Sequence, residues 1–497
     1  MSKAIVIGAG IGGIATSIRL AVQGYQVQVF EANAYPGGKL SEIRVGDYRF
    51  DAGPSLFTLP DQVEDLFRLA GKRTEDYFAY DALDVITHYF WPDGLRLTAY
   101  AEPEKFAQEV EATLGEPAAQ VLKLLNKSRE IHDVTSHVFL EKSLHKLATF
   151  LDRDTIRSIF QLHKIDAFRT MHQANASYFQ DPRLVQLFDR YATYNGSDPY
   201  QAPGTLNVIP HLEYHLGAYF PRGGMYQITQ SLYRLACDLG VQYHFGQPVD
   251  QILVKNGRAQ GIRLGEDQVA ADLVVSNADV VPTYRRLLPD QPAPERTLRQ
   301  PRSSSALIFY WGVKQQFPQL DLHNILFGAD YREEFRYIWE KKSIHPDPTV
   351  YVNVTSKYNP SDAPQGCENW FTMINVPHDD GQDWDRLIPE ARAHIIAKLS
   401  QMLDVDLEPL IEAEAILEPR TIQSKTSSYL GALYGSSSNN KFAAFLRHPN
   451  FSRKIENLYF CGGSVHPGGG IPLSLLGARI VGDLVPAGEK SSTFVGA

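Results

Sequence analysis

Strand-like and helix-like hydrophobic patterns alternate over the first 31 residues of the chain. The apolar run 4–7 predicts a buried strand, and the spacing of apolar positions over 14–22 predicts a helix that stops before Gly24. Alternating apolar positions over 27–30 predict a second strand that ends at Glu31. We therefore expect a strand–turn–helix–strand unit at the start of the chain.

The turn of this unit carries Gly8, Gly10 and Gly13 at G-x-G-x-x-G spacing. In such a turn the first glycine permits a tight bend, the second lets the backbone approach a pyrophosphate, and the third lets helix and strand pack closely. The helix N-terminus attracts phosphate, and Glu31 is placed to accept hydrogen bonds from ribose hydroxyls. Because a carboxylate repels a 2′-phosphate, the pattern predicts FAD or NAD rather than NADP. An ordinary βα unit with a glycine turn is the alternative.

The hydrophobic pattern changes several times after this unit. Helical periodicity dominates 101–215, an α/β pattern returns over 216–282, and aromatic-rich strands alternate with helices over 283–420. A short strand at 458–460 leads into a glycine-rich turn and a helix that begins near Ile471. We predict an α/β fold with a discontinuous Rossmann-like nucleotide-binding domain, an inserted helical block and a mixed-sheet substrate domain. The nucleotide-binding domain is expected to comprise 1–100, 216–282 and 421–497. The helical block is expected to comprise 101–215, and the substrate domain 283–420.

Composition narrows the functional classes. The 497 residues are 43% hydrophobic and 21% charged, which is typical of a globular protein with a large core. A formal net charge of −9 argues against a nucleic-acid partner. The three cysteines share no metal-ligand spacing and their count is odd, so neither a metal site nor a disulfide framework is predicted. We find no signal-peptide pattern and no apolar run of about eighteen residues, so we expect a cytosolic protein or one on a membrane surface.

Three further turns carry residues that suit a nearby ligand. Two glycines before Lys39 bring backbone N–H groups close to a ligand, and the lysine can neutralise a phosphate. The turn that begins at Asp51 is rigid, and the paired glycines after Arg222 stand just before a predicted helix. The candidate cofactor-binding residues in these turns are Gly37, Gly38, Lys39, Gly53, Pro54, Gly223 and Gly224. For each turn a purely structural role is the alternative.

The C-terminal segment contains five glycines within the nine residues 462–470. Glycine costs backbone entropy on folding, so such a run indicates that something must approach the bare backbone. Pro472 suits the first turn of a helix whose positive end faces whatever lies above Gly470 and Ile471. A flavin ring, which gains negative charge on reduction, suits that place. Gly462 and Gly463 complete the candidate cofactor-binding set, and a plain glycine-rich loop is the alternative.

These motifs, in this order, resemble those of the bacterial carotenoid desaturases, the phytoene-desaturase family of the flavin amine oxidase superfamily. The resemblance covers nearly the whole chain and is carried by the segments 8–13, 37–39, 50–55, 221–225, 276–279 and 462–472, together with Glu31. The segment 462–468, Gly-Gly-Ser-Val-His-Pro-Gly, looks more like the hydroxycarotenoid 3,4-desaturases than the usual phytoene desaturases. The latter more often show an alanine–glycine pair and a threonine before the histidine–proline.

The resemblance implies an FAD enzyme that removes two hydrogens from a long isoprenoid chain, one as a hydride to the flavin and one as a proton. It also implies a hydrophobic polyene substrate in a tunnel formed by the second sheet domain and the helical block. The expected location is cytoplasmic, peripheral on the inner face of the cell membrane. Residues 139–163 mix apolar and basic positions, as a membrane-facing amphipathic helix pair would; a core-facing helix with a solvated face is the alternative.

No residue stands out as a catalytic base. His466 in the flavin-proximal loop is the first candidate and Asp51 the second, and each also suits a structural role in its loop or turn. The leading function is 3,4-desaturation of a 1-hydroxylated acyclic carotenoid. A phytoene desaturase or carotene isomerase on the same scaffold is the near alternative, and a flavin amine oxidase or a non-redox prenyl-binding chaperone are more distant ones. The sequence leaves the oligomeric state and the electron acceptor open.

Overall fold

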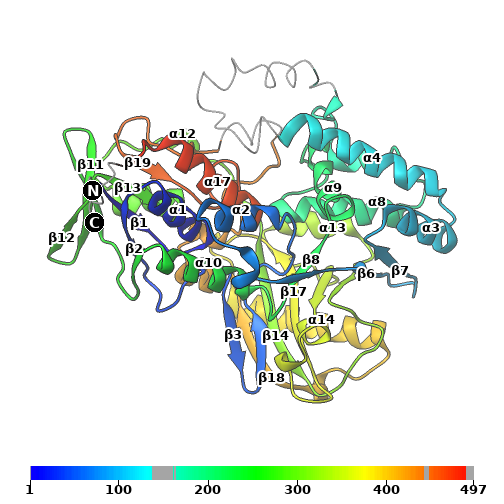
Figure 1. Ribbon diagram of the computed structural model, residues 1–497. Coiled ribbons are helices and arrows are strands. Elements are labelled where there is room, and N and C mark those ends of the chain that lie inside the picture. Colours follow the sequence, from blue (N-terminus) through cyan, green and yellow to red (C-terminus); the bar gives the residue numbers. More distant parts are fainter. Residues whose placement is uncertain (1, 137–160, 162–163, 441–446, 489–497) are drawn as a thin grey trace.

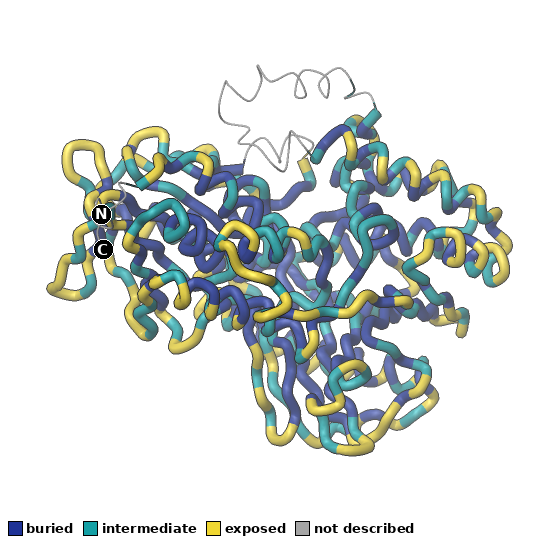
Figure 2. Tube along the Cα trace, in the orientation of Figure 1, coloured by how far each residue is buried: buried dark blue, intermediate teal, exposed yellow. Residues whose placement is uncertain are grey.

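The computed structural model describes residues 2–136, 161, 164–440 and 447–488. In Figure 1 these residues form a lobe around a parallel sheet on the left, a second lobe around a larger mixed sheet below, and a group of helices at the upper right. Figure 2 shows that the central strands are buried, whereas many peripheral loops are exposed.

A five-stranded parallel sheet is the centre of the first lobe. Its strands are β1 (Lys3–Ile7), β2 (Gln26–Phe30), β9 (Gln242–His244), β13 (Leu273–Ser276) and β19 (Leu458–Phe460). The order β19-β13-β1-β2-β9 places distant parts of the chain side by side (Figure 1). The sheet is sandwiched between helices α1 (Ile11–Val22), α2 (Asp61–Leu69), α10 (Tyr226–Asp238) and α17 (Ile471–Leu484) and a small sheet of β10 (Gln251–Lys255), β11 (Arg258–Leu264) and β12 (Asp267–Ala270).

The alternation of side chains along β1 explains this sandwich. Ala4 and Val6 pack with the helices, whereas Ile5 and Ile7 pack with the small sheet, because successive side chains of a strand point to opposite faces. A strand covered on both sides needs an unbroken apolar run, which is the pattern that predicted it.

The second lobe contains a seven-stranded sheet of order β18-β14-β17-β16-β15-β6-β7. Its strands are β6 (Val85–Phe90), β7 (Arg96–Tyr100), β14 (Ser305–Val313), β15 (His323–Leu326), β16 (Val350–Asn353), β17 (Glu368–Val376) and β18 (Ile411–Leu417). Helix α14 (Trp384–Leu403) packs on the face that carries Phe309 and Trp311. The opposite face, with Ile308 and Tyr310, packs against the hairpin of β3 (Glu42–Val45) and β4 (Tyr48–Asp51).

Residues 85–100 belong to this second sheet and not to the parallel one. β6 pairs in parallel with β15, so the bound expected at residue 100 does not coincide with the division between the sheets. Local periodicity identifies a strand but not its partner, which is why the sequence pattern placed this segment with the first domain. The remaining domain division stays a prediction.

The helices at the upper right of Figure 1 pack on the β6–β7 end of the second sheet. They are α3 (Pro103–Leu114), α4 (Ala118–Thr135), α7 (Met171–Asn175), α8 (Pro182–Asp189), the 3-10 helices η4 (Arg190–Asn195) and η5 (Gly204–Val208), and α9 (Ile209–Tyr214). Within the described ranges, no helix has the length and apolar character needed to cross a bilayer. Apart from residue 161, the expected amphipathic pair 139–163 lies outside the described residues.

Short elements connect these parts. The strands are β5 (Tyr80–Ala82) and β8 (Tyr219–Pro221), which pair with each other, and the helices are α11 (Val280–Pro282), α12 (Glu295–Leu298), α13 (Tyr331–Arg336), α15 (Pro419–Thr426), η1 (Thr74–Asp76), η6 (Thr283–Leu287), η7 (Tyr337–Lys341), η8 (Thr355–Lys357), η9 (Pro360–Asp362), η10 (Glu408–Leu410) and η11 (Tyr429–Gly431).

The elements predicted from the first 31 residues are confirmed, and both strands begin one residue earlier than predicted. Helix α1 begins at Ile11 rather than at residue 14, because Gly12 and Gly13 take part in its first turn. The predicted strand at 458–460 and the helix from Ile471 are also confirmed.

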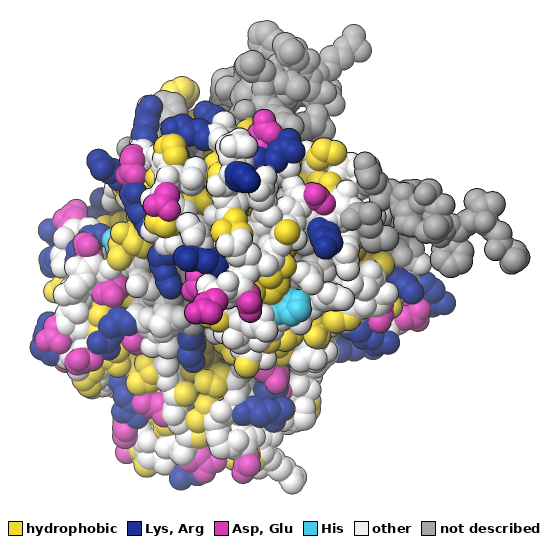
Figure 3. Space-filling view, turned by 90° about the vertical axis from the view of Figure 1, so that its left-hand side faces the viewer, with side chains coloured by type: hydrophobic (Ala, Val, Ile, Leu, Met, Phe, Trp, Pro, Cys, Tyr) yellow, Lys and Arg dark blue, Asp and Glu magenta, His cyan; other side chains and the backbone are white. Residues whose placement is uncertain are grey.

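Charged side chains of both signs are interspersed on the face shown in Figure 3, which is the left-hand side of Figure 1. Basic and acidic groups that alternate in this way do not form the single-sign surface by which proteins attract nucleic acid. On this face, the described residues therefore form a surface of mixed positive and negative charge.

Helix–strand packing at the first turn makes a stability prediction. A Cβ at Gly13 would lie 2.1 Å from the carbonyl oxygen of Gly8, a backbone atom that cannot rotate away. Gly13→Ala should lower the free energy of unfolding by about 1–3 kcal/mol, seen as a lower Tm in thermal denaturation.

The matched control is Gly477→Ala in α17, where an added Cβ would meet its nearest neighbour at an ordinary 3.5 Å. That change should be neutral or stabilising by up to about 1 kcal/mol, because alanine loses less backbone entropy than glycine. Equal Tm values for the two variants would contradict the packing argument.

Candidate functional site

The G-x-G-x-x-G turn lies at the carboxyl end of the parallel sheet, where close backbone contacts hold it. Gly8 has a φ of +96°, which side chains other than glycine rarely tolerate, and its N–H donates to the carbonyl of Phe30 (2.7 Å). The space beside Gly10 is filled by Asn277, whose Oδ1 would lie 2.7 Å from an added Cβ. The first intrahelical bond of α1 is accepted by Gly10, so the preceding N–H groups remain available to a phosphate.

Glu31 follows β2, and its carboxylate is buried against the same turn. Oε2 accepts a hydrogen bond from the N–H of Ala9 (2.7 Å), and Oε1 accepts from the backbone and side-chain nitrogens of Asn33 (2.8 and 2.9 Å). A carboxylate has about four acceptor positions, so one remains for another donor. The predicted bond to a ribose hydroxyl is compatible with this geometry and stays a prediction.

Two other turns pack on the first one. The N–H of Gly37 donates to the carbonyl of Ala9 (2.7 Å). A Cβ on Gly53 would lie 2.0 Å from the carbonyl oxygen of Lys39, which shows how closely the turn after β4 approaches the second turn. Three segments that are separate in the sequence therefore form one surface at the carboxyl edge of the sheet.

A cavity of about 850 Å³ extends from this surface toward the second lobe. Its other walls come from the face of the second sheet that carries Ile308 and Tyr310, and from α9 and the chain around Phe168. Most of its lining is apolar. The predicted site residues on its walls are Gly38, Lys39, Gly53, Pro54, His466, Gly470, Ile471 and Pro472. Those outside its lining are Gly8, Gly10, Gly13, Glu31, Gly37, Asp51, Gly223, Gly224, Gly462 and Gly463.

Lys39 brings a cationic group to the cavity wall. Its Nζ donates to the carbonyl of Leu433 (2.7 Å). Desolvation lowers the pKa of Lys39 to about 8, although the charge of Asp279 acts in the opposite direction. A nearby anion would favour the charged form and raise this pKa again.

The C-terminal loop places the N-terminus of α17 at the same cavity. Gly470 precedes the helix with a φ of +106°, and Pro472 stands in its first turn. The N–H of Ser474 donates to the carbonyl of Gly470 (3.0 Å), so the N–H groups of Ile471 and Leu473 come before the first intrahelical bond. The positive end of the helix therefore faces the cavity.

His466 is 1% exposed, and its backbone is held on both sides. Its N–H donates to the carbonyl of His448 (2.9 Å), and its own carbonyl accepts from Nδ2 of Asn450 (2.7 Å). These contacts stabilise the loop, which agrees with the structural role considered for His466 as the alternative to catalysis. The imidazole nevertheless belongs to a residue of the cavity wall, so its catalytic role stays a prediction.

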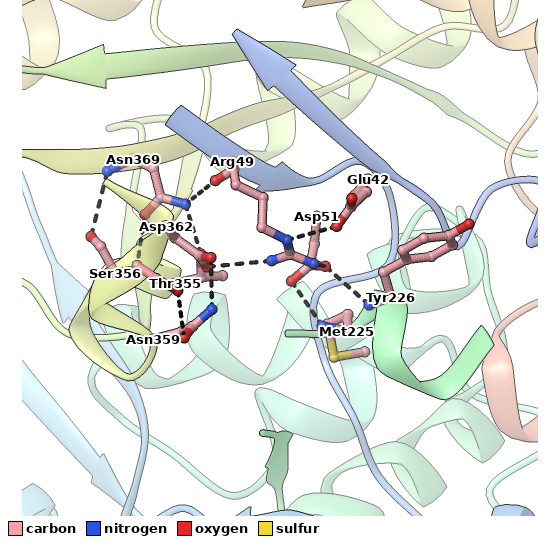
Figure 4. Close-up of polar contacts among 11 residues, drawn as sticks. Glu42, Arg49, Asp51, Met225, Tyr226, Thr355, Ser356, Asn359, Asp362 and Asn369 are labelled. Carbon is pink, nitrogen blue, oxygen red and sulfur yellow. Dashed lines mark hydrogen bonds and ion pairs between the residues drawn. The ribbon is translucent and has the colours of Figure 1, made fainter. Parts of the chain in front are cut away.

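Asp51 lies in a buried ion-pair network with no place on the cavity wall (Figure 4). Its oxygens accept from Nη2 of Arg49 (2.7 Å) and from the backbone N–H groups of Met225 (2.8 Å) and Tyr226 (3.0 Å) at the start of α10. Such contacts agree with the structural role in the turn that was the alternative to catalysis for Asp51. A Cβ on Gly224 would lie 2.4 Å from Nη1 of Arg49, so this glycine accommodates the network.

Arg49 is the centre of this network, although it belongs to none of the glycine motifs recognised in the sequence. Its guanidinium also pairs with Glu42 (2.8 Å) and with the buried Asp362 of the second lobe (3.3 Å). Burial alone would lower the pKa of Arg49, but the charges of Asp51 and Asp362 outweigh it and raise the pKa. A basic residue two positions before an acidic one on a fully buried strand is the only sequence signal that points to it.

These residues fit FAD. The first turn offers helix N–H groups and little side-chain bulk to a pyrophosphate, Glu31 keeps an acceptor position for a ribose, and Lys39 offers a cation. At the other end, the N-terminus of α17 lies on a largely apolar cavity that suits a flat aromatic ring. The residues expected to bind the dinucleotide and those expected to face the ring therefore lie along one connected surface.

The chain matches the family described as flavin containing amine oxidoreductase over residues 11–483. A 1-hydroxycarotenoid 3,4-desaturase from Flavobacterium sp. (strain P99-3) is 51% identical to it over 98% of this chain and 99% of that protein. The chain belongs to the flavin-containing amine oxidoreductases, in their carotenoid-desaturase branch. A zeta-carotene-forming phytoene desaturase from Myxococcus xanthus is 33% identical over 96% of this chain and 93% of that protein.

A solved structure of an oxidoreductase from Methanosarcina mazei has the same fold. It superposes with a TM-score of 0.62 at 15% identity, over 97% of this chain and all of that one. Family membership confirms the flavin cofactor, FAD, and the oxidoreductase class expected from the sequence, and it sets aside a non-redox chaperone.

Because Lys39 has a lowered pKa, the affinity for FAD is expected to depend on pH. In the FAD-free protein, Lys39 loses its proton as the pH rises through about 8, and the site then loses a positive charge. The affinity for FAD should therefore fall between pH 7 and pH 9, by at most about tenfold per pH unit. Fluorescence titration of FAD into the apoprotein measures this change.

Lys39→Met should bind FAD more weakly at pH 7 and show a flatter pH dependence. The control is Lys72→Met, which removes an exposed charge and should leave the wild-type profile unchanged. A wild-type affinity that is constant between pH 7 and pH 9 would contradict the assignment of Lys39 to the cofactor site.

Proposed function

We propose that the protein introduces a carbon–carbon double bond at the 3,4 position of a 1-hydroxylated acyclic carotenoid. One observation carries this proposal: a single, largely apolar cavity extends from the turns expected to bind the cofactor to the second sheet and the helices beside it. A long polyene needs such a space next to the redox ring. The 51% identity to a 1-hydroxycarotenoid 3,4-desaturase supports the choice of substrate and bond.

The reaction removes a hydride from one carbon and a proton from its neighbour. When bound, FAD supplies the two-electron acceptor for the hydride. The N-terminus of α17 stabilises negative charge at the ring end of the site, and the apolar walls exclude water and align the chain. A conjugated chain delocalises the positive charge that develops on it, so the cavity needs no strongly charged partner at the reacting carbons. His466 is the proposed proton acceptor on the cavity wall.

We also propose that the substrate enters from a membrane surface to which the protein binds peripherally on the cytoplasmic side. Phe168 supports this proposal, because it lines the cavity and is 88% exposed. A large apolar side chain at the edge of an apolar cavity suits contact with lipid better than contact with water. The substrate domain of the proposal is the second sheet together with the helices that cover its β6–β7 end.

A panel of substrates tests the proposed reaction. Flavin-loaded protein in liposomes, with an artificial electron acceptor, should convert 1-hydroxylated acyclic carotenes. The product should absorb at longer wavelength and weigh two hydrogens less than the substrate. Conversion of phytoene instead would favour a phytoene desaturase, and a change of double-bond geometry at constant mass would favour an isomerase. If none of these polyenes changes while FAD is bound, the carotenoid proposal fails.

The role of His466 is tested separately. Because the imidazole is the proposed proton acceptor, His466→Ala should lower kcat by about 100-fold or more while the bound flavin absorbs as in the wild type. Asn450→Ala is the control, since it removes a bond to the His466 carbonyl but keeps the imidazole. An unchanged kcat in His466→Ala would leave His466 with only its structural contacts.

A further inference from the structure

Several polar side chains gather on one part of the largely apolar cavity wall. Arg190 and Tyr194 come from η4, His323 from β15 and Tyr351 from β16, and all four line the cavity. Ser55 completes this polar patch, since its Oγ lies 2.8 Å from the hydroxyl oxygen of Tyr351. Ser55 belongs to one of the predicted cofactor-binding turns, so the polar patch adjoins the flavin side of the cavity.

Hydrogen bonds determine which nitrogen of His323 carries the proton. Nδ2 of Asn353 donates to the carbonyl of Leu322 (2.8 Å), which identifies it as the amide nitrogen, and it also lies 3.2 Å from Nδ1 of His323. Nδ1 is therefore an acceptor, and its one lone pair is shared between this amide and the hydroxyl of Tyr351, which lies 2.7 Å away. Burial and the charge of Arg190 lower the pKa of His323 to about 3, so the ring is neutral.

The single proton of the neutral ring is thus on Nε2. This nitrogen is buried and has no hydrogen-bond partner in the described part of the chain. His323 lines the cavity and therefore holds a buried N–H donor for which the described residues provide no acceptor.

Arg190 holds a second donor of the same kind. Its Nη2 donates to the hydroxyl of Tyr89 (2.8 Å) and its Nη1 to that of Tyr194 (3.2 Å), whereas its buried Nε lacks a partner among the described residues. The charge of the buried Glu213 favours the charged form of this guanidinium, and the hydroxyls of Tyr191 and Tyr194 both donate to that carboxylate (2.6 Å each). A carboxylate ligand would add an unbalanced buried charge, so a neutral oxygen suits the polar patch better.

A buried N–H group without an acceptor costs free energy, and two of them on one wall favour a ligand that brings oxygen lone pairs. We propose that Arg190 and His323 determine substrate specificity by donating hydrogen bonds to the hydroxyl oxygen of an oxygenated polyene. This proposal rests on the proposed function, because it identifies what recognises the polar end of that substrate.

Such a contact selects the bond that reacts. An apolar chain can slide along an apolar cavity with little change in contact, so the cavity alone does not fix its position. In a 1-hydroxylated chain, only one carbon separates the hydroxyl-bearing carbon from the 3,4 bond. A hydroxyl held beside a cofactor-binding turn therefore holds this bond near the redox ring.

Two substitutions at His323 separate its two nitrogens. His323→Asn keeps an acceptor near the position of Nδ1 for Tyr351 and Asn353 but removes the Nε2 donor. His323→Gln places an amide nitrogen near the position of Nε2 and so retains the donor. Arg190→Lys keeps the charge opposite Glu213 but removes the Nε donor. Tm and flavin absorption of each variant show whether it folds and binds its cofactor.

The measurement compares a 1-hydroxylated acyclic carotene with its counterpart that lacks the hydroxyl. In the wild type, kcat/KM should favour the hydroxylated substrate by on the order of 100-fold. His323→Asn and Arg190→Lys should each reduce this ratio by about tenfold without lowering kcat/KM for the other substrate, and His323→Gln should keep the ratio within about threefold. A wild-type ratio near one, or equal losses for both substrates, would overturn the proposal.

A binding measurement keeps the inference separate from the proposed reaction. The absorption shift of each carotene on binding to the holoenzyme gives its Kd without turnover. A preference for the hydroxylated carotene that His323→Asn removes would support the polar patch even if neither carotene were converted. Conversion of both carotenes with equal Kd values would support the desaturase and overturn the role of the polar patch.

Discussion

The buried guanidinium of Arg49 is the contact on which the arrangement of this molecule depends. It pairs with Asp51 on its own strand and with Asp362 of the second lobe, and Asp51 in turn accepts two N–H groups at the start of α10. One cation thus joins a hairpin, a helix of the first lobe and the second sheet. Removing one partner of such a buried group typically costs about 3–5 kcal/mol, because it leaves an uncompensated charge.

The turns proposed to bind the cofactor adjoin this network. The chain leaves Asp51 directly into the turn that contains Gly53 and Ser55, and that turn lies against the carbonyl of Lys39. Lys39 belongs to the turn that packs on the G-x-G-x-x-G loop. The position of Asp51 therefore sets the relative position of the segments that meet at the cavity. This explains why an aspartate that is also a candidate base accepts three structural hydrogen bonds.

Sequence reasoning found the parts of the site that have local rules. Gly8, Gly13 and Gly470 could be recognised because a positive φ or a close backbone approach excludes other residues, and these constraints act within a few positions. The role of Arg49 could not be predicted from the sequence, because its partners lie up to 313 positions away. Strand pairing could not be predicted for the same reason, since nothing in residues 85–100 states that β6 will pair with β15.

The polar patch shows the same limit inside the cavity. His323 stands in a strand that is buried at every position, where a lone histidine is most simply a core residue satisfied by its neighbours. Only the contacts of Asn353 and Tyr351 show that one nitrogen is satisfied and the other is not. A buried donor without an acceptor destabilises the folded protein, and a ligand that accepts its hydrogen bond removes this destabilisation. A cavity that merely enclosed a hydrocarbon would be more stable with leucine at that position, so its polarity indicates an oxygen in the substrate.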